Sequence, residues 1–261
     1  MDFTYSLAGL FVGMIVGLTG VGGGSLMTPL LVLLFGISPA TAIGTDLLYA
    51  SITKSGGAAV HGLKGSIDWP VVGWLALGSV PASVATFLLL SQRQHASGTS
   101  DAILKLALGV MLLATAVSLV YRKPLQSWFA NRAQERKQPA GARKPIATIL
   151  IGASIGIAVS LSSVGAGAVG VTALLLLYPL MATSKVIGTD IAHAVPLTLV
   201  AGLGHASLGN VDLTLLAALL LGSLPGVAAG SMLTTRLPEI VIRNILITLL
   251  VAVGGRLVWL R

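Results

Sequence analysis

Residues 17–25 read Gly-Leu-Thr-Gly-Val-Gly-Gly-Gly-Ser and interrupt an otherwise apolar segment. Each glycine in a helix interior costs about 1 kcal/mol relative to alanine. Because five of the first eight positions are glycine, a continuous helix is unfavourable here. Backbone groups freed by a break at membrane depth must be satisfied by protein or water. The sequence therefore predicts a broken helix that restarts near Ser25.

The composition indicates that this break lies in a membrane protein. Of 261 residues, 55% are hydrophobic and 9% are charged, and the mean hydropathy is +0.94. A soluble domain carries about 25% charged residues, and a transmembrane helix needs about 20 mostly apolar residues. Apolar segments of that scale lie at 5–36, 40–60, 69–91, 101–121, 146–180, 184–208, 211–235 and 238–260. We predict an all-α polytopic protein with about eight transmembrane segments in the lipid bilayer.

An internal duplication is visible at a fixed offset. The tetrapeptide Ile-Gly-Thr-Asp occurs at 43–46 and again at 187–190. The same offset of 144 aligns His61 with His205, Gly65 with Gly209, Asp68 with Asp212, Gly78 with Gly222, Ser79 with Ser223 and Pro81 with Pro225. With one inserted residue, 19–24 (TGVGGG) falls on 162–167 (SSVGAG). Such a pattern indicates repetition, so we predict two homologous four-segment repeats that each begin with a glycine-broken helix.

A basic stretch at 122–145 separates the two repeats. Its basic residues are Arg122, Lys123, Arg132, Arg136, Lys137, Arg143 and Lys144, against the single acid Glu135. Cytoplasmic loops of membrane proteins carry an excess of Lys and Arg. We therefore predict a first transmembrane repeat at 1–121, a cytoplasmic linker at 122–145 and a second repeat at 146–261, in a bacterial cell inner membrane. A short surface helix within the linker is left open.

The relative orientation of the repeats is also open. Four full crossings in each copy would make the repeats parallel. If the broken segments 5–36 and 146–180 enter and leave on one side, each copy has an odd number of crossings and the repeats are inverted. Lys64 has no basic counterpart near Asn210, which favours opposite sides.

The two breaks are the first candidate site. A restarting helix presents free N–H groups and the positive end of its dipole, which bind anions without a charged side chain. Matching interruptions in two halves point to the binding site of a transporter. The alternative is close helix packing through small residues. The predicted substrate-binding residues here are Thr19, Gly22, Gly23, Gly24, Ser25, Ser162, Ser163, Gly165 and Gly167.

A polar stripe along segment 40–60 is the second candidate. Asp46, Lys54 and His61 share one face of a helix, and ionisable residues within membrane segments usually face a bundle interior or a cavity. Lys54 is therefore added to the predicted substrate-binding residues as a counter-charge. Alternatively, Asp46 neutralises Lys54 and the pair locks the helices together.

The acidic and imidazole side chains of both halves could serve either of two roles, proton coupling or structural support. These residues are Asp46, His61, Asp190, His193 and His205, predicted as proton-coupling or structural residues. Imidazole titrates near neutral pH, which suits proton coupling. The two aspartates could instead cap backbone N–H groups near a helix start, and the histidines at the segment ends could be interfacial. Asp68 and Asp212 precede apolar runs and are predicted N-caps.

Several function classes are not expected. The chain has no cysteine, which removes thiolate chemistry and most zinc and iron–sulfur sites. It has no HExxH motif or P-loop lysine, and its glycine cluster lacks the strand and downstream acid of a dinucleotide site. Since the basic residues mostly lie between apolar runs, nucleic acid is not an expected partner. We expect no enzymatic activity, no cofactor and no metal site.

The motifs resemble those of a known family. GLTGVGGGSLMTPLLVLLFGISPATAIGTDLL at 17–48, HGLKGSIDW at 61–69 and fainter copies at 162–190 and 205–212 resemble the sulfite exporter TauE/SafE family, also called the 4-toluene sulfonate uptake permease family. The resemblance covers nearly the whole chain. It implies a secondary transporter of sulfite or small organosulfonates that works without ATP and is coupled to protons.

The second half departs from the first-half motif, which leaves an asymmetric site open. Ser162 and Ser163 stand where the first half has Thr19 and Gly20, and no proline matches Pro29. The hypothesis is a proton-coupled transporter that binds a small anion at the broken-helix N-termini between the repeats. A passive anion channel and a non-transporting scaffold protein remain alternatives. The exact substrate, the direction of transport and a homodimeric state are open.

Overall fold

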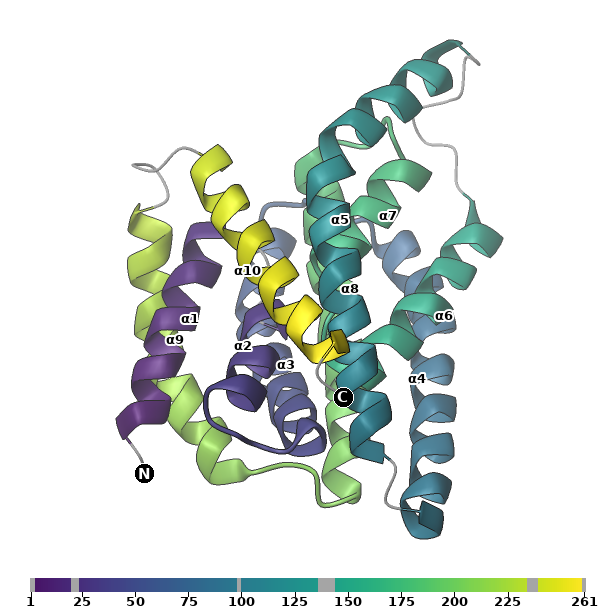
Figure 1. Ribbon diagram of the computed structural model, residues 1–261. Coiled ribbons are helices and arrows are strands. Elements are labelled where there is room, and N and C mark those ends of the chain that lie inside the picture. The colour runs from purple at the N-terminus through teal and green to yellow at the C-terminus, as the bar shows by residue number, and fades with distance from the viewer. Residues whose placement is uncertain (1–2, 20–23, 98–99, 136–143, 234–238, 260–261) are drawn as a thin grey trace.

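The computed structural model describes residues 3–19, 24–97, 100–135, 144–233 and 239–259 (Figure 1). These residues form an all-helical bundle. Its helices are α1 (Phe3–Thr19), α2 (Gly24–Leu33), α3 (Pro39–Leu63), α4 (Trp69–Ser97), α5 (Ser100–Glu135), α6 (Pro145–Ser162), α7 (Ala168–Leu177), α8 (Thr183–Ser207), α9 (Leu213–Leu233) and α10 (Glu239–Trp259).

Two of the predicted crossing-scale segments are each divided into a long and a short helix. Segment 5–36 is divided into α1 and α2, and segment 146–180 into α6 and α7, in each case at the glycine cluster. The short helices have 10 residues each. At about 1.5 Å per residue they reach only about half of a hydrocarbon core that is about 30 Å thick.

Helices α3 and α8 form the centre of the bundle and run antiparallel. Gly44, near the start of α3, lies against the carbonyl of Asn210 beyond the end of α8. In the matching contact, Gly188 near the start of α8 lies against the carbonyl of Ser66 beyond α3. Glycine is required at both places because a Cβ would overlap these carbonyls. Halfway along, the Ser51 hydroxyl donates to the Val195 carbonyl at 3.4 Å.

Two further helix pairs pack closely and in parallel. Figure 1 shows α1 beside α9 on one side of the bundle and α4 beside α6 on the other. Glycines of one helix meet the backbone of its partner: Gly9 meets Leu219 and Gly13 meets Ser223, as Gly152 meets Leu75 and Gly156 meets Ser79. Within each pair the contacts advance along both chains together, which defines a parallel packing.

The short helix α7 returns the chain to the side from which α6 entered. Helix α4 is parallel to α6, and it is also parallel to α8, since Ser79 meets His193 and, further along, Phe87 meets Gly204. Helices α6 and α8 therefore run in the same direction, and α7 lies between them in the chain. The first half behaves alike: α9 is parallel to both α1 and α3.

Helix α5 is longer than the sequence analysis predicted. It continues through Glu135 and so includes the first part of the basic stretch at 122–145, where only a short surface helix had been left open. Residues such as Leu, Gln, Ala and Glu after Pro124 favour helix. Residues 136–143 of the linker lie outside the described residues.

Within the described residues, five helices are long and apolar enough to cross a membrane. These spans are Trp69–Gln92, Asp101–Arg122, Pro145–Ser162, Thr183–Ser207 and Leu213–Gly230. Helix α3 has the length to cross, but its second half is more polar because it carries Lys54 and several small residues. The apolar helices support a multi-pass membrane protein.

Candidate functional site

The break between α6 and α7 has a backbone that only certain residues can adopt. Ser163 lies in the left-handed region at φ 58°, and Gly165 and Gly167 have φ values of 123° and 144°. A non-glycine residue in such regions costs about 1–3 kcal/mol, which explains the two glycines. The Ser162 hydroxyl accepts from the Val164 N–H at 3.1 Å and so closes the turn.

Lys54 connects this break to helix α3. Its Nζ donates to the carbonyl of Ala166 at 2.6 Å, although Ala166 lies in the other half of the chain. The ammonium also interacts electrostatically with Asp190 and, less strongly, with Asp46. The predicted pairing of Lys54 with Asp46 on its own helix is therefore only part of the arrangement.

Asp46 is fully buried and accepts two hydroxyl groups. Its Oδ2 receives Thr28 Oγ1 of α2 at 2.5 Å and Ser163 Oγ of the second break at 2.9 Å. Asp46 lies about two turns beyond Ser38, which is the actual N-cap of α3. The alternative that Asp46 caps its own helix is therefore wrong, and the carboxylate instead ties α2 and the second break to α3.

Asp190 lies against the first turn of α7. It is 1% exposed, and its Oδ1 is so close to Gly170 that an added Cβ would overlap it. Among the described residues, this Oδ1 has no hydrogen-bond partner. Asp190 is also well inside α8, which begins at Thr183, so it does not cap its own helix either.

The three charged groups and the break form a single cluster at the centre of the bundle, in which the two aspartates are buried and Lys54 is half-buried. It combines one ammonium group with two carboxylates beside the N-terminus of α7. The positive end of the helix dipole and the ammonium suit an oxyanion. The carboxylates oppose one unless a positive charge or a proton accompanies it.

Of the histidines, His193 lies at the edge of this cluster and interacts electrostatically with Lys54, whereas His61 and His205 lie outside it. His193 Nε2 lies 2.7 Å from Ser79 Oγ of α4, and His205 Nε2 donates to the Ser160 carbonyl at 2.9 Å. His61 Nδ1 lies 2.8 Å from Ser66 Oγ. His61 and His205 occupy the last turns of antiparallel helices, so they are at opposite ends of the α3–α8 pair. His205 is 3% exposed and lies within the last turn of α8, and its interfacial position stays a prediction.

The predicted caps at the starts of α4 and α9 are confirmed. Asp68 Oδ1 accepts the N–H of Val71 at 3.3 Å, and Asp212 Oδ1 accepts the N–H of Leu215 at 2.9 Å. Asp68 also pairs with Lys185 at 3.3 Å.

The first break is described only at its edges. Gly22 and Gly23 lie outside the described residues, as do the side chains of Thr19 and Ser25. Gly24 is the first residue of α2. Their predicted part in substrate binding therefore stays a prediction.

Sequence reasoning missed three partners of the charged and imidazole side chains. Thr28 supports Asp46, the Ala166 carbonyl holds Lys54, and Ser79 meets His193. A polar residue one turn after the glycine cluster was a usable signal for Thr28. No sequence signal indicates which carbonyl a lysine will meet.

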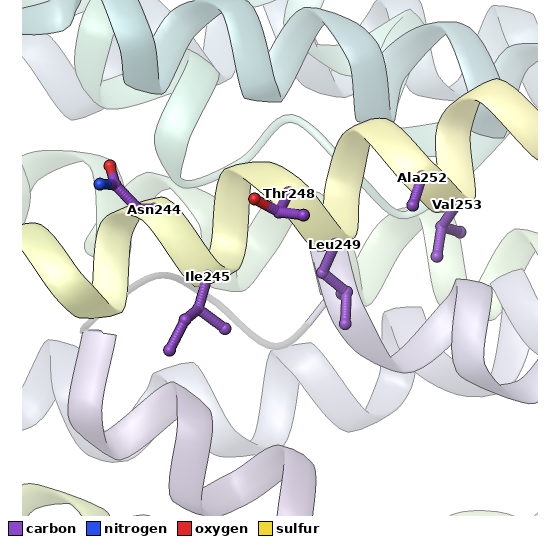
Figure 2. Close-up of a pocket in the computed structure, with 6 residues that line it drawn as sticks. All are labelled: Asn244, Ile245, Thr248, Leu249, Ala252 and Val253. Carbon is purple, nitrogen blue, oxygen red and sulfur yellow. The ribbon is translucent and has the colours of Figure 1, made fainter.

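A separate groove of about 510 Å³ runs along α10 (Figure 2). It is lined by Asn244, Ile245, Thr248, Leu249, Ala252 and Val253. None of these residues is charged, and none belongs to the central cluster. The groove has the character of an apolar surface rather than of a site for an ion.

Comparison with known proteins places the chain in a family. The model of the family described as "Sulfite exporter TauE/SafE" matches residues 5–257. The chain is 41% identical over 259 residues to "Probable membrane transporter protein YjnA" of Bacillus subtilis (strain 168), an alignment that covers 99% of this chain and 100% of the relative.

More distant relatives have similar names. "Probable membrane transporter protein YdhB" of the same organism is 25% identical over 237 residues, with 89% and 90% of the two chains covered. A "Probable membrane transporter protein" of Xylella fastidiosa (strain Temecula1 / ATCC 700964) is 27% identical over 235 residues, with 88% and 84% covered. No solved structure matches the chain significantly. The chain thus belongs to the sulfite exporter TauE/SafE family and is a membrane transporter rather than an enzyme.

Proposed function

We propose that this protein is a secondary transporter of small sulfur-containing anions, sulfite or organosulfonates, coupled to protons. The observation that carries the proposal is the position of Lys54. Its side chain is half-buried, and its ammonium is held by a backbone carbonyl of the break that precedes α7. A half-buried cation beside a helix N-terminus is an arrangement that favours a small oxyanion.

The first turn of α7 offers N–H groups to such an anion. The N–H of Gly170 bonds to the Gly165 carbonyl at 2.9 Å, and that of Val171 to the Gly167 carbonyl at 2.8 Å. The N–H groups of Ala168 and Val169 precede these and have no carbonyl of their own helix to bond to. Sulfonate oxygens could accept from them while Lys54 supplies the counter-charge.

We propose further that the fold consists of two inverted repeats, 1–121 and 146–261, each with a returning broken helix. The antiparallel packing of α3 and α8 supports this arrangement, as do the contacts that recur between α1 and α9 and between α6 and α4. Equivalent helices that run in opposite directions imply a two-fold axis in the membrane plane. Movement of one repeat against the other would then open the central cluster to either side.

The alternatives make different demands. A scaffold has no use for a lysine held beside a helix break, and the family of this chain consists of transporters by name. A passive channel would conduct anions without regard to a pH gradient. Proteoliposomes with an imposed pH gradient distinguish a coupled transporter from a channel. A coupled transporter accumulates sulfite or sulfonate against its concentration gradient, and a channel does not.

The substitution Lys54→Ala tests the site. We expect sulfite or methanesulfonate uptake into proteoliposomes to fall at least tenfold, because the anion loses its only counter-charge from α3 within the described cluster. Lys64→Ala is the matched control: Lys64 is an exposed residue at the end of α3, and its loss should leave uptake unchanged. Equal uptake by Lys54→Ala and wild-type protein, at equal reconstitution, would remove Lys54 from the site.

A further inference from the structure

The two central aspartates occupy matching positions but have different surroundings. Asp46 Oδ2 accepts hydroxyl groups from Thr28 and Ser163. Hydroxyl donors stabilise the ionised form of a carboxylate. The Oδ1 atoms of both aspartates are buried without a partner among the described residues, and that of Asp190 lies against Gly170. Asp190 differs from Asp46 in that no hydroxyl group of the described residues donates to it. The two carboxylates therefore differ in how well their negative charge is supported.

The sequence explains one part of this difference and the packing explains the other. At the offset of 143 that aligns the two breaks, Ser163 matches Gly20, which has no hydroxyl group. Helices α2 and α7 correspond at an offset of 144, which matches Thr28 with Thr172. The Thr172 hydroxyl meets Ser118 of α5 at 2.8 Å, and among the described residues no hydrogen bond joins it to Asp190.

The negative charge of Asp190 depends on cations from neighbouring helices. Lys54 of α3 interacts with it most strongly, followed by Arg122 of α5. The packed helices α6 and α7 contain no titratable residue. On α4 the titratable residues Arg93 and His95 lie about 20 Å beyond Ser79, at 1.5 Å per residue. The other titratable residues nearby are Asp46 and, one turn along α8, His193. Toward the start of α8 lie Lys185, which pairs with Asp68, and His61, which lies against Gly188.

An anion that binds Lys54 competes with Asp190 for the same ammonium group. This step rests on the proposed function. We propose that Asp190 is the residue that binds the coupled proton: when an anion engages Lys54, a proton from solvent binds the unpartnered Oδ1 and neutralises the carboxylate. One negative charge and one proton then enter together, and the charge of the central cluster is unchanged. Release of the anion returns Lys54 to Asp190 and expels the proton.

The number of protons bound with each anion tests this coupling. Calorimetric titration of purified protein with methanesulfonate or 4-toluenesulfonate, in two buffers of different ionisation enthalpy, gives that number directly. The buffers are Tris and imidazole, because common sulfonate buffers are themselves candidate ligands. These sulfonates stay ionised near neutral pH, so a proton taken up must bind the protein. We expect about one proton per anion for the wild-type protein.

Three variants locate the proton. Asp190→Asn imitates the protonated side chain and should bind the sulfonate at least as tightly, with no proton uptake and with an affinity that no longer depends on pH. Asp46→Asn should bind more weakly but still take up one proton per anion. Asp212→Asn is the matched control, since asparagine also caps a helix, and it should behave as the wild-type protein does.

The outcomes separate the two proposals. Sulfonate binding without proton uptake by the wild-type protein overturns the coupling but leaves the anion site. Undiminished proton uptake by Asp190→Asn excludes Asp190, and uptake of sodium in place of a proton excludes the mechanism. If neither these sulfonates nor sulfite binds, the proposed function fails and the coupling fails with it.

Discussion

At the level of single residues, the burial of Asp46 requires the hydroxyl groups that reach it from two other segments. A buried group that loses a hydrogen-bond partner costs about 1–3 kcal/mol. Thr28→Val, which removes the hydroxyl group and nearly keeps the shape of the side chain, should therefore lower the free energy of unfolding by about that amount. Thermal unfolding in detergent measures the effect.

The control for this substitution is Thr53→Val on α3. The Thr53 hydroxyl donates only to carbonyls of its own helix, Tyr49 at 2.9 Å and Ala50 at 3.3 Å. Those carbonyls keep their helical hydrogen bonds. We therefore expect Thr53→Val to lower the free energy of unfolding by much less than Thr28→Val does. Equal losses for the two variants would show that Asp46 does not depend on Thr28.

The sequence was sufficient to select the charged residues of the cluster but not to assign their partners. Asp46, Lys54 and Asp190 were recognisable because ionisable side chains within apolar segments are costly. That Lys54 reaches Ala166, and interacts more strongly with Asp190 than with Asp46, depends on the packing of α3 against the other half. The periodicity of a sequence shows which residues share a face of one helix, but not which residues of another helix they contact.

At the level of helices, glycine-mediated contact determines how the parallel pairs pack. Gly78 lies against the carbonyl of Ile149, and Gly222 lies in the same way against the carbonyl of Ser6. A methyl group at either position would overlap a backbone atom that cannot move independently. Gly78→Ala and Gly222→Ala should each destabilise the protein by about 1–3 kcal/mol, visible as a lower unfolding temperature in detergent.

Gly73→Ala provides the comparison within α4. Nothing lies within 4 Å of a Cβ at this position, and the helix backbone there is regular. Alanine is the better helix former by about 1 kcal/mol, so this variant should be as stable as the wild-type protein or more so. A destabilised Gly73→Ala would mean that glycine itself, rather than close contact, explains the other two variants.

Hydropathy located most of the helices but not their directions. The segments at 40–60, 69–91, 184–208 and 211–235 correspond to α3, α4, α8 and α9. The segments at 5–36 and 146–180 were recognised as broken. Their apolar length does not show whether such a segment crosses the membrane or turns back to the side from which it entered. Their direction follows only from the neighbours against which they pack, which the sequence does not specify.

At the level of the whole molecule, helix direction determines where the charges lie. Because α3 and α8 are antiparallel, the end of α3 with Lys64 lies beside the start of α8 with Lys185. Helix α5 ends on that same side, since it follows the antiparallel turn after α4, and there the basic linker at 122–145 begins.

The absence of cysteine from the chain makes this arrangement directly testable. Single substitutions Lys64→Cys and Ser207→Cys place thiols at the matching ends of α3 and α8, and Ala140→Cys marks the linker. Inverted repeats require Lys64→Cys and Ala140→Cys to react with a membrane-impermeant maleimide from the cytoplasmic face, because basic segments stay inside. Ser207→Cys should react only from the opposite face. The measurement is labelling of intact cells against inside-out vesicles, and reaction of Lys64→Cys and Ser207→Cys from one face would indicate parallel repeats and contradict the antiparallel packing of α3 and α8.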